Sequence, residues 1–303
     1  MRGAGLVDPT WSGRLLLTGA DRRSYLQGLL TNDIDALAPG TSCYAAMLTA
    51  QGRMLTDMRV YELGDGVLLT LPAAVTRSIR EHLERLVFAE DVQVRDVSES
   101  RVEMGVCGPR AAEVIAKAAV APRAVVICGD EAGIDGFAVF VDRASAPEVR
   151  EALVKADAVP VTEADVEVAR VERGRPRWGA DMDTDTIPLE AGIEDRAISR
   201  TKGCYVGQEV IVRVLDRGHG RVARRLVGIA FDPSAAVPAI GARVVANGRD
   251  VGQITSAVWS PSLSRPVALG YVHRDFVEPG TKVSVDGATA AIAELPFVRS
   301  AGP

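Results

Sequence analysis

The most distinctive stretch of the sequence runs Lys202-Gly203-Cys204-Tyr205-Val206-Gly207-Gln208-Glu209. A single thiol stands between two glycines there, with an ammonium group two residues earlier and a carboxylate five residues later. Glycine permits a positive φ and leaves the sulfur without bulky neighbours, and a nearby ammonium group favours the thiolate over the thiol. This pattern is typical of a reactive or ligand-contacting cysteine. The alternative is a turn in which Cys204 is a small buried apolar side chain, as free cysteines often are.

Length and composition are those of an ordinary globular chain. The 303 residues are 47% hydrophobic and 25% charged, which allows two or three domains at about 150 residues each. Residues 1–17 contain no apolar run of signal-peptide length, and no stretch approaches the roughly 18 apolar residues of a membrane span. We therefore expect a cytoplasmic protein without a membrane partner. The net charge of −5 argues against nucleic acid as the main partner.

The cysteines and histidines are too scattered to hold a metal cluster. No two cysteines form a CxxC pair and no two histidines have helical ligand spacing; the residues are Cys43, Cys107, Cys128, Cys204, His82, His219 and His273. The sequence therefore predicts no resident metal. Cys43, Cys107 and Cys128 are expected to be buried structural thiols.

Residues 1–221 are predicted to form two α+β lobes, at about 1–100 and 101–221. Hydrophobic periodicity and capping residues predict helices at 21–30 with Asp21 as the N-cap, after Pro72, from 108 to about 120, and at 147–156 and 162–173. Strands are predicted at 54–61, 67–71, 92–97, 102–107, 124–128 and 137–142. This order favours two related α+β lobes over a doubly wound parallel sheet.

The chain changes character after the last of these helices. Residues 175–198 are rich in Gly, Pro, Asp and Thr, and a long irregular segment of this kind is usually functional or a linker. Short alternating strands then follow, and Asn247-Gly248 and Asp286-Gly287 are hairpin turn signals. We therefore expect a boundary near Arg221 and a small antiparallel β-barrel over residues 222–303.

The motif at residues 202–209 resembles the signature of the YgfZ-type folate-binding proteins. These proteins are the branch of the aminomethyltransferase (glycine-cleavage T-protein, GcvT-like) superfamily that is linked to iron-sulfur protein maintenance. All eight positions fit, and the resemblance covers nearly the whole chain. The other segments that carry it are residues 30–33, 52–57, 170–174, 178–181, 187–192, 210–213 and 217–218.

The resemblance implies a fold and a cofactor. The fold is two α+β lobes and a C-terminal antiparallel β-barrel, arranged as a ring around a central hole. The hole would hold tetrahydrofolate or a one-carbon derivative, with Cys204 at its rim. Our division of the chain from its residues alone agrees with these three parts.

The resemblance also implies site residues. Glu172 would meet the donor edge of the pterin, since a carboxylate can accept from two adjacent N–H groups; the alternative is a solvated helix carboxylate. Arg213 would contact the glutamyl carboxylate of folate or form a salt bridge to Glu209. Asn32 and Tyr205 would be further folate contacts.

Asp57 matches the second acidic position of a strand that lies near the folate nitrogens in true aminomethyltransferases, while Thr56 replaces the first. A carboxylate at that place can orient the folate amine or exchange a proton with it. The 202–209 motif, however, replaces a Lys-x-Asp-Phe-Ile-Gly pattern of the transferases. A lipoyl-arm aminomethyltransferase is therefore disfavoured.

Three functions are compatible with these residues. The leading hypothesis is a folate-binding accessory protein for iron-sulfur cluster assembly or repair. In it, Cys204, with its thiolate favoured by Lys202, transiently serves iron-sulfur proteins or assembly factors. The alternative is a folate-dependent one-carbon (aminomethyl or formyl) transferase that uses Asp57 and Cys204. The third is a regulatory or scaffold protein in which folate is a vestigial or sensing ligand.

Overall fold

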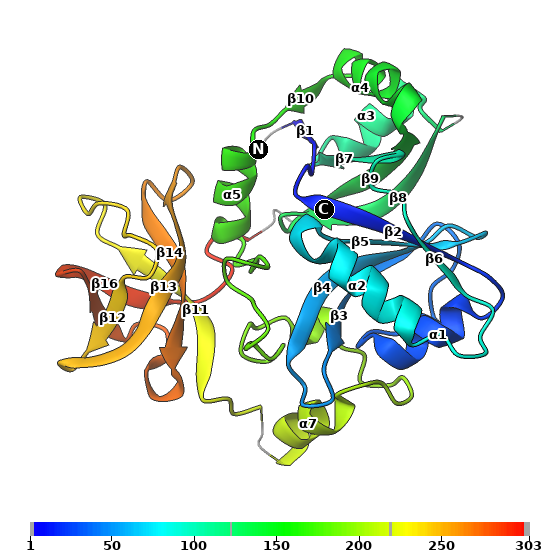
Figure 1. Cartoon of the computed structure of the whole chain (residues 1–303). Coiled ribbons are helices and arrows are strands. Elements are labelled where there is room, and N and C mark those ends of the chain that lie inside the picture. The colour runs from blue at the N-terminus through cyan, green and yellow to red at the C-terminus, as the bar shows by residue number, and fades with distance from the viewer. Residues whose placement is uncertain (1–2, 122, 218–219, 300–303) are drawn as a thin grey trace. The chain divides into compact units, whose positions relative to one another are not determined.

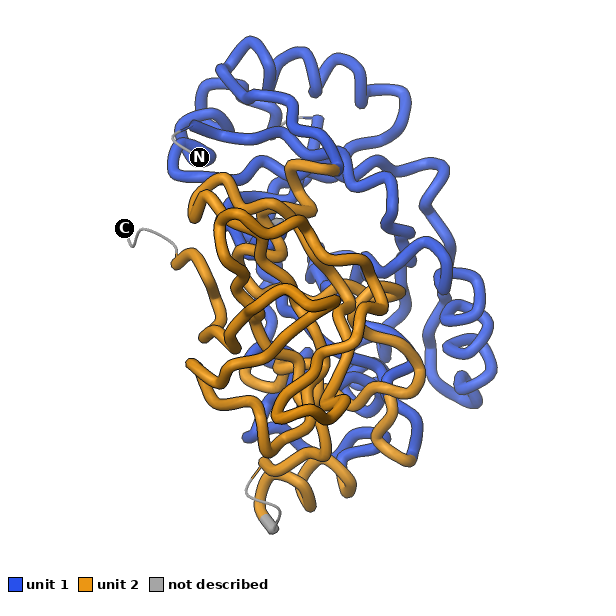
Figure 2. Tube along the Cα trace, turned by 90° about the vertical axis from the view of Figure 1, so that its left-hand side faces the viewer, with its two compact units in different colours: residues 1–50, 54–163, 196–208 blue, residues 51–53, 164–195, 209–303 orange. Residues whose placement is uncertain are grey.

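The computed structural model describes residues 3–121, 123–217 and 220–299, and for Glu131 and Arg217 the backbone alone. The chain divides into two compact units, coloured in Figure 2. The first unit comprises Met1–Ala50, Met54–Glu163 and Arg196–Gln208, and the second comprises Gln51–Arg53, Ala164–Asp195 and Glu209–Pro303. Each unit has its own sheets and its own hydrophobic core, and each is described by itself below.

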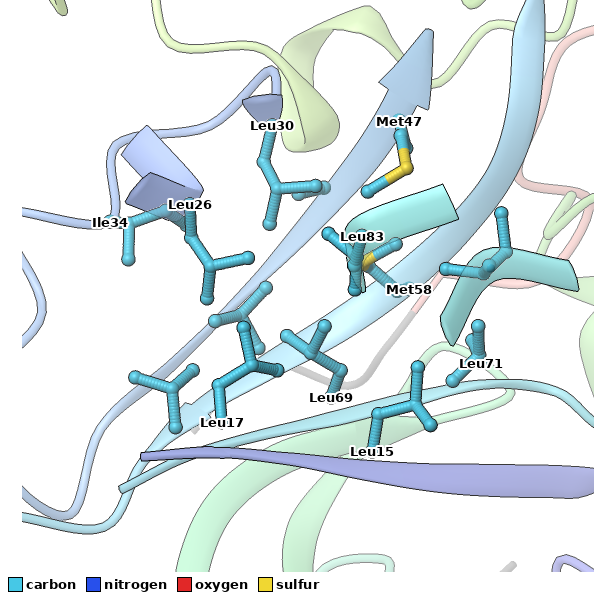
Figure 3. Packing of buried hydrophobic residues seen from close by; sticks show 14 of the residues in the cluster. Leu15, Leu17, Leu26, Leu30, Ile34, Met47, Met58, Leu69, Leu71 and Leu83 are labelled. Carbon is cyan, nitrogen blue, oxygen red and sulfur yellow. The ribbon is translucent and has the colours of Figure 1, made fainter. Parts of the chain in front are cut away.

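One sheet of the first unit is fully antiparallel. Its strand order is β3-β4-β5-β2-β6, with β2 at Ser12–Thr18, β3 at Ser42–Leu48, β4 at Met54–Glu62, β5 at Val67–Pro72 and β6 at Gln93–Asp96. Helices α1 (Arg22–Leu29) and α2 (Ala73–Arg85) contribute to the apolar core on this sheet (Figure 3). Leu26 and Leu83 of the two helices are fully buried there beside Leu15 and Leu17 of β2. The helical stripe and the alternating strands therefore bury one shared face.

The second sheet of this unit has the order β10-β1-β7-β9-β8. Its strands are β1 (Ala4–Val7), β7 (Arg101–Cys107), β8 (Ala124–Glu131), β9 (Ile134–Asp142) and β10 (Ala158–Pro160). Helices α3 (Ala111–Ala118) and α4 (Ala146–Lys155), the latter preceded by a 3-10 turn at Arg143–Ser145, bury Val114, Val149 and Leu153 against it. Strand β1 pairs in parallel with β10 and antiparallel with β7. The first strand of the chain therefore lies in the sheet that residues 101–160 complete.

The two sheets contact each other through aromatic side chains. Tyr61 of β4 and Phe140 of β9 are almost fully buried, and their ring centroids lie 4.8 Å apart in an edge-to-face arrangement. Leu68 and Ile127 complete this cluster. Such an aromatic pair contributes about 0.5–1.5 kcal/mol beyond the area it buries.

The second unit contains a closed β-barrel, labelled in Figure 1. The barrel order is β11-β14-β13-β12-β15-β16, and the strands are β11 (Arg224–Phe231), β12 (Arg243–Ala246), β13 (Arg249–Ser260), β14 (Arg265–His273), β15 (Lys282–Val285) and β16 (Ala288–Ala293). Pairing of β11 with both β14 and β16 closes the barrel. The hairpin turns predicted at Asn247-Gly248 and Asp286-Gly287 are present, with positive φ at all four residues.

Short helices and an irregular segment occur where the sequence passes from one unit to the other. Helix α5 (Glu163–Glu172) is followed by residues 175–193, which form turns, and by α6 (Glu194–Ala197). After the 202–209 motif come α7 (Gln208–Val212), a π-helical turn at Arg213–Arg217 and, later, a 3-10 turn at Arg274–Phe276. No helix among the described residues is long and apolar enough to cross a membrane. Gly218 and His219 lie outside the described residues.

The predicted fold class is confirmed: the first unit has two sheets flanked by helices, and the second has an antiparallel barrel. The sequence analysis missed β1, β2, β3 and β10. Strand β2 carries three consecutive leucines, and β1 and β10 are only four and three residues long, so none of them gives a clear alternating pattern. Cys107 is buried as predicted, but the prediction for Cys128 is wrong, because this residue is exposed on the edge strand β8.

Candidate functional site

The carboxylate of Asp57 has one paired oxygen and one unpaired oxygen. Tyr44 of β3 lies opposite Arg59 in the β3–β4 register, and Ala46 lies opposite Asp57, so Tyr44 and Asp57 are diagonal neighbours on one face of the sheet. The Tyr44 hydroxyl donates to Asp57 Oδ2 at 2.7 Å. Asp57 Oδ1 is cut off from solvent and accepts no hydrogen bond from another described residue. A buried acceptor without a donor is unfavourable by about 1–3 kcal/mol, and a catalytic role or a bound partner is among the explanations for such a group.

Two guanidinium groups lie close to this pair. The Cζ atom of Arg196 lies 4.8 Å from the centroid of the Tyr44 ring, and that of Arg59 lies 6.0 Å from it. Arg59 also forms an ion pair with Asp130 of β8. Burial raises the pKa of Asp57, and the hydrogen bond from Tyr44 and the charges of Arg196 and Arg59 act in the opposite direction. Burial therefore disfavours the ionised carboxylate, and one hydroxyl donor and two cations partly stabilise it.

Asn32 holds the backbone around this pair. Its Nδ2 donates to the carbonyl of Tyr44 at 2.8 Å and to the carbonyl of Arg196 at 2.9 Å. Its Oδ1 accepts from the backbone N–H of Asp33. Asn32, predicted as a folate contact, thus uses its amide to join three segments of the first unit. Whether folate also reaches it stays a prediction.

Lys202 is anchored to the end of helix α1. Its Nζ donates to the carbonyls of Gln27 and Leu30 at 2.6 Å and to that of Asn32 at 2.9 Å. The last carbonyls of a helix lack donors within the helix, and a cation is favourable at that end. Burial lowers the pKa of Lys202 to about 8. Lys202 was expected to favour the thiolate of Cys204, but the ammonium contacts described are three carbonyls and the Tyr205 ring, whose centroid lies 5.2 Å away.

The rest of the motif places a thiol at the surface. Tyr205 is buried, and burial raises the pKa of its hydroxyl to about 12. Val206 donates from its backbone N–H to the carbonyl of Gly28 at 3.2 Å. Cys204, between these anchored residues and Lys202, is exposed. The interpretation of Cys204 as a small buried apolar side chain is therefore wrong, and a folate contact by Tyr205 stays a prediction.

Glu172 is buried in the second unit. It ends helix α5, and its side chain accepts hydrogen bonds from Ser260 Oγ at 2.5 Å, from the N–H of Ser262 at 3.3 Å and from Ser262 Oγ at 3.0 Å. With 8% of its surface exposed, it is not the solvated helix carboxylate that was the alternative. Each carboxylate oxygen has more than one lone pair, so the predicted pterin contact remains open.

Arg213 and Glu209 are both exposed. Arg213 begins the π-helical turn that follows α7. The second unit also contains a cavity of about 990 Å³, lined by charged side chains of both signs that include Arg224, Arg243 and His273. None of the predicted site residues lines this cavity. The role of Arg213 toward a folate glutamyl group therefore stays a prediction.

Sequence reasoning missed Tyr44, Arg59 and Arg196. Tyr44 and Arg59 could have been found from the pairing of β3 with β4, which places both residues beside Asp57. Strand β3 was not predicted, so this pairing was not available. Arg196 lies in the segment predicted to be irregular, and no hydrophobic periodicity there indicates where its side chain lies in the fold. Within the part of the chain that the structure describes, no group of three or more His, Cys, Asp or Glu side chains could hold a metal ion.

Comparison with protein families gives two matches. Residues 1–125 match the GCVT N-terminal domain, and residues 224–298 match the glycine cleavage T-protein C-terminal barrel domain. The second match coincides with the barrel strands described above.

Individual relatives cover nearly the whole chain. An aminomethyltransferase of Rubrobacter xylanophilus is 30% identical over an alignment of 315 positions that covers 98% of this chain and 83% of the relative. An aminomethyltransferase of Nostoc sp. is 29% identical over an alignment of 324 positions that covers 98% of this chain and 85% of the relative. The crystal structure of glycine cleavage system aminomethyltransferase T from Bartonella henselae superimposes with a TM-score of 0.88 at 25% identity, covering 98% of this chain and 87% of that one.

Proposed function

Because the chain belongs to the glycine cleavage T-protein family of aminomethyltransferases, we propose that it is a tetrahydrofolate-dependent one-carbon transferase in which Asp57 faces the folate amine. The family relationship supports the use of folate, and the side chains around Asp57 support the chemistry. The resemblance of residues 202–209 to the YgfZ signature supports a place in that branch. The one-carbon unit would then come from a carrier other than a lipoyl arm.

The single observation that carries the proposal is the unpaired oxygen of Asp57. Oδ2 is used by Tyr44, while Oδ1 is buried and has no donor from another described residue. Tetrahydrofolate carries N–H groups that fit such an acceptor, so the residues present suit the cofactor. A metal ion would need further oxygen or nitrogen ligands, and the described side chains around Asp57 are a tyrosine and two arginines.

In this proposal, the residues around Asp57 in the first unit have separate roles. When bound, tetrahydrofolate supplies the amine nitrogen that accepts or releases the one-carbon unit. Asp57 would accept a hydrogen bond from that nitrogen at Oδ1 and exchange a proton with it, and general acid–base catalysis of this kind contributes typically 10²–10⁴-fold to a rate. The hydrogen bond from Tyr44 and the charges of Arg196 and Arg59 offset part of the rise in the Asp57 pKa that burial causes. Burial raises the pKa of Asp57. A proton acceptor is most efficient when its pKa lies near the pH of the reaction, so the direction of this shift favours proton exchange.

A second function is supported by the exposed thiol of Cys204. In this alternative, the protein binds folate but acts as an accessory to iron-sulfur proteins, and Cys204 transiently ligates or protects a cluster. One thiolate suits transient contact with iron, whereas a stable cluster needs about four such ligands. The proposal and the alternative therefore assign the decisive role to different residues.

Two variants of the full-length protein separate the two functions. Each is purified for turnover of methylene- and formyl-tetrahydrofolate, and each is expressed in a strain that lacks the protein, where several iron-sulfur enzymes are assayed. The transferase proposal expects Asp57→Asn to lose turnover and Cys204→Ser to keep at least part of it. The accessory alternative expects Cys204→Ser to bind folate normally but fail to restore the enzymes. Turnover by neither the native protein nor any variant, with folate still bound, would refute the transferase proposal.

A further inference from the structure

The hydroxyl of Tyr44 makes a single described hydrogen bond, and its acceptor is Asp57. A carboxylate turns easily about the bond that joins it to Cβ, because this torsion has broad minima. The 2.7 Å contact from Tyr44 fixes Oδ2, which leaves Oδ1 as the oxygen that accepts no hydrogen bond from another described residue. Tyr44 therefore determines which oxygen of Asp57 is free to meet a ligand.

Tyr44 is itself held in place from two directions. The Asn32 amide donates to the Tyr44 carbonyl and to the Arg196 carbonyl, so the same side chain fixes both residues. The guanidinium of Arg196 then lies over the Tyr44 ring at 4.8 Å, a favourable cation–π distance. The ring cannot move away from Asp57 without breaking the contacts that surround it.

We propose that Tyr44 is a positioning residue that presents Oδ1 of Asp57 to the ligand and stabilises the ionised carboxylate through its hydroxyl. This inference rests on the proposed function, because it assumes that Asp57 is the group that meets folate. Asn32 and Arg196 are the supports of Tyr44. Asn32 thus acts on the site through the tyrosine, whatever else it contacts.

The charged and titratable groups that face Asp57 come from three elements. They are Tyr44 on β3, Arg59 on β4 and Arg196 on α6. Burial, together with the neighbouring charge of Asp57, raises the pKa of Tyr44 well above its ordinary value. The hydroxyl therefore stays protonated across the neutral range and donates to the carboxylate, so Asp57 is the member of this pair that titrates at the lower pH.

The test replaces only the hydroxyl. Tyr44→Phe in the full-length protein keeps the ring for Arg196 and removes the donor to Asp57. The ¹³C carboxyl resonance of Asp57, assigned by its loss in Asp57→Asn, is followed as a function of pH without folate. A charge-assisted hydrogen bond of this kind is strong enough that we expect the midpoint to rise by about one pH unit.

Tyr25→Phe is the matched control. Tyr25 is also a buried tyrosine of the first unit, and its hydroxyl donates to the carbonyl of Leu83 at 2.6 Å. This variant loses a buried hydrogen bond of similar length without touching Asp57, so it should leave the Asp57 midpoint unchanged. An unchanged midpoint in Tyr44→Phe, or an equal shift in Tyr25→Phe, overturns the inference.

The turnover of the native protein and of Tyr44→Phe distinguishes this inference from the proposed function. If Asp57 works in its ionised form, the acid limb of the pH–rate profile moves to higher pH in Tyr44→Phe by the same amount as the midpoint. A shifted midpoint with an unmoved acid limb, or with no turnover at all, keeps Tyr44 as the partner of Asp57 and refutes the role of Asp57 in transfer.

Discussion

Replacement of Lys202 by methionine tests whether the 202–209 motif is held by its lysine. Methionine keeps the length and the apolar part of the side chain but removes the ammonium group. Three carbonyls then lose their donor, those of Gln27, Leu30 and Asn32. Two of them belong to the C-terminal end of α1, where the helix offers no donor of its own.

The size of the effect follows from these contacts. A hydrogen bond to a charged group contributes about 1.5–3 kcal/mol, but Lys202 is half-buried and water can reach part of the freed carbonyls. We therefore expect the three contacts together to contribute about 3 kcal/mol to the free energy of unfolding. For a unit of this size, that loss lowers the melting temperature by about 6–12 °C.

The assay is thermal unfolding of the full-length protein, with Lys117→Met as the control. Lys117 is exposed and pairs with Asp157 at 2.6 Å, and an exposed ion pair contributes less than about 1 kcal/mol. If Lys202→Met melts within about 2 °C of the native protein, the anchoring role is refuted. Loss of cellular function with normal stability would instead return Lys202 to its predicted role beside Cys204.

Two further predictions concern buried carboxylates. Burial raises the pKa of folded Asp57 above its unfolded value, so the ionised group destabilises the fold at neutral pH, and this effect disappears once the pH falls below about 4. Asp57→Asn should therefore raise the melting temperature at pH 7 and give no gain near pH 3; an equal gain at both would contradict this. Glu172→Gln keeps an acceptor for Ser260 and Ser262 but loses the charge, so tetrahydrofolate affinity should fall about tenfold in calorimetry with little change in stability. Unchanged affinity would show that Glu172 is not the pterin partner.

Local pattern was sufficient for most of the fold. The six barrel strands follow from short alternating segments separated by Asn-Gly and Asp-Gly turns, because these dipeptides tolerate the positive φ that a tight hairpin needs. Helix α2 follows from Pro72 and the apolar stripe that contains Ile79 and Leu83. Of the strands that were missed, β1 and β10 are short, and β2 and β3 carry apolar runs that do not alternate with polar residues. The pairing partners of β1, which are β7 and β10, also lie far away in the sequence.

The candidate site was predicted less completely than the fold. Asp57, Glu172 and Cys204 were predicted as site residues because a motif marks each of them, and their roles stay predictions. Tyr44 and Arg196 belong to segments that no sequence pattern joins, and it is the amide of Asn32 that connects their backbones. The contacts of Lys202 depend on where α1 ends, and the sequence around Cys204 holds no information about that position.

The most direct measurement for the central claim is the rate of one-carbon transfer at saturating tetrahydrofolate derivative, compared between the native protein and Asp57→Asn. Saturation removes differences in folate affinity, so the ratio reports on the carboxylate alone. The account predicts turnover by the native protein and a loss of at least about 100-fold in the variant, as expected for removal of a group that exchanges a proton with the substrate. Equal rates in the two proteins would contradict it.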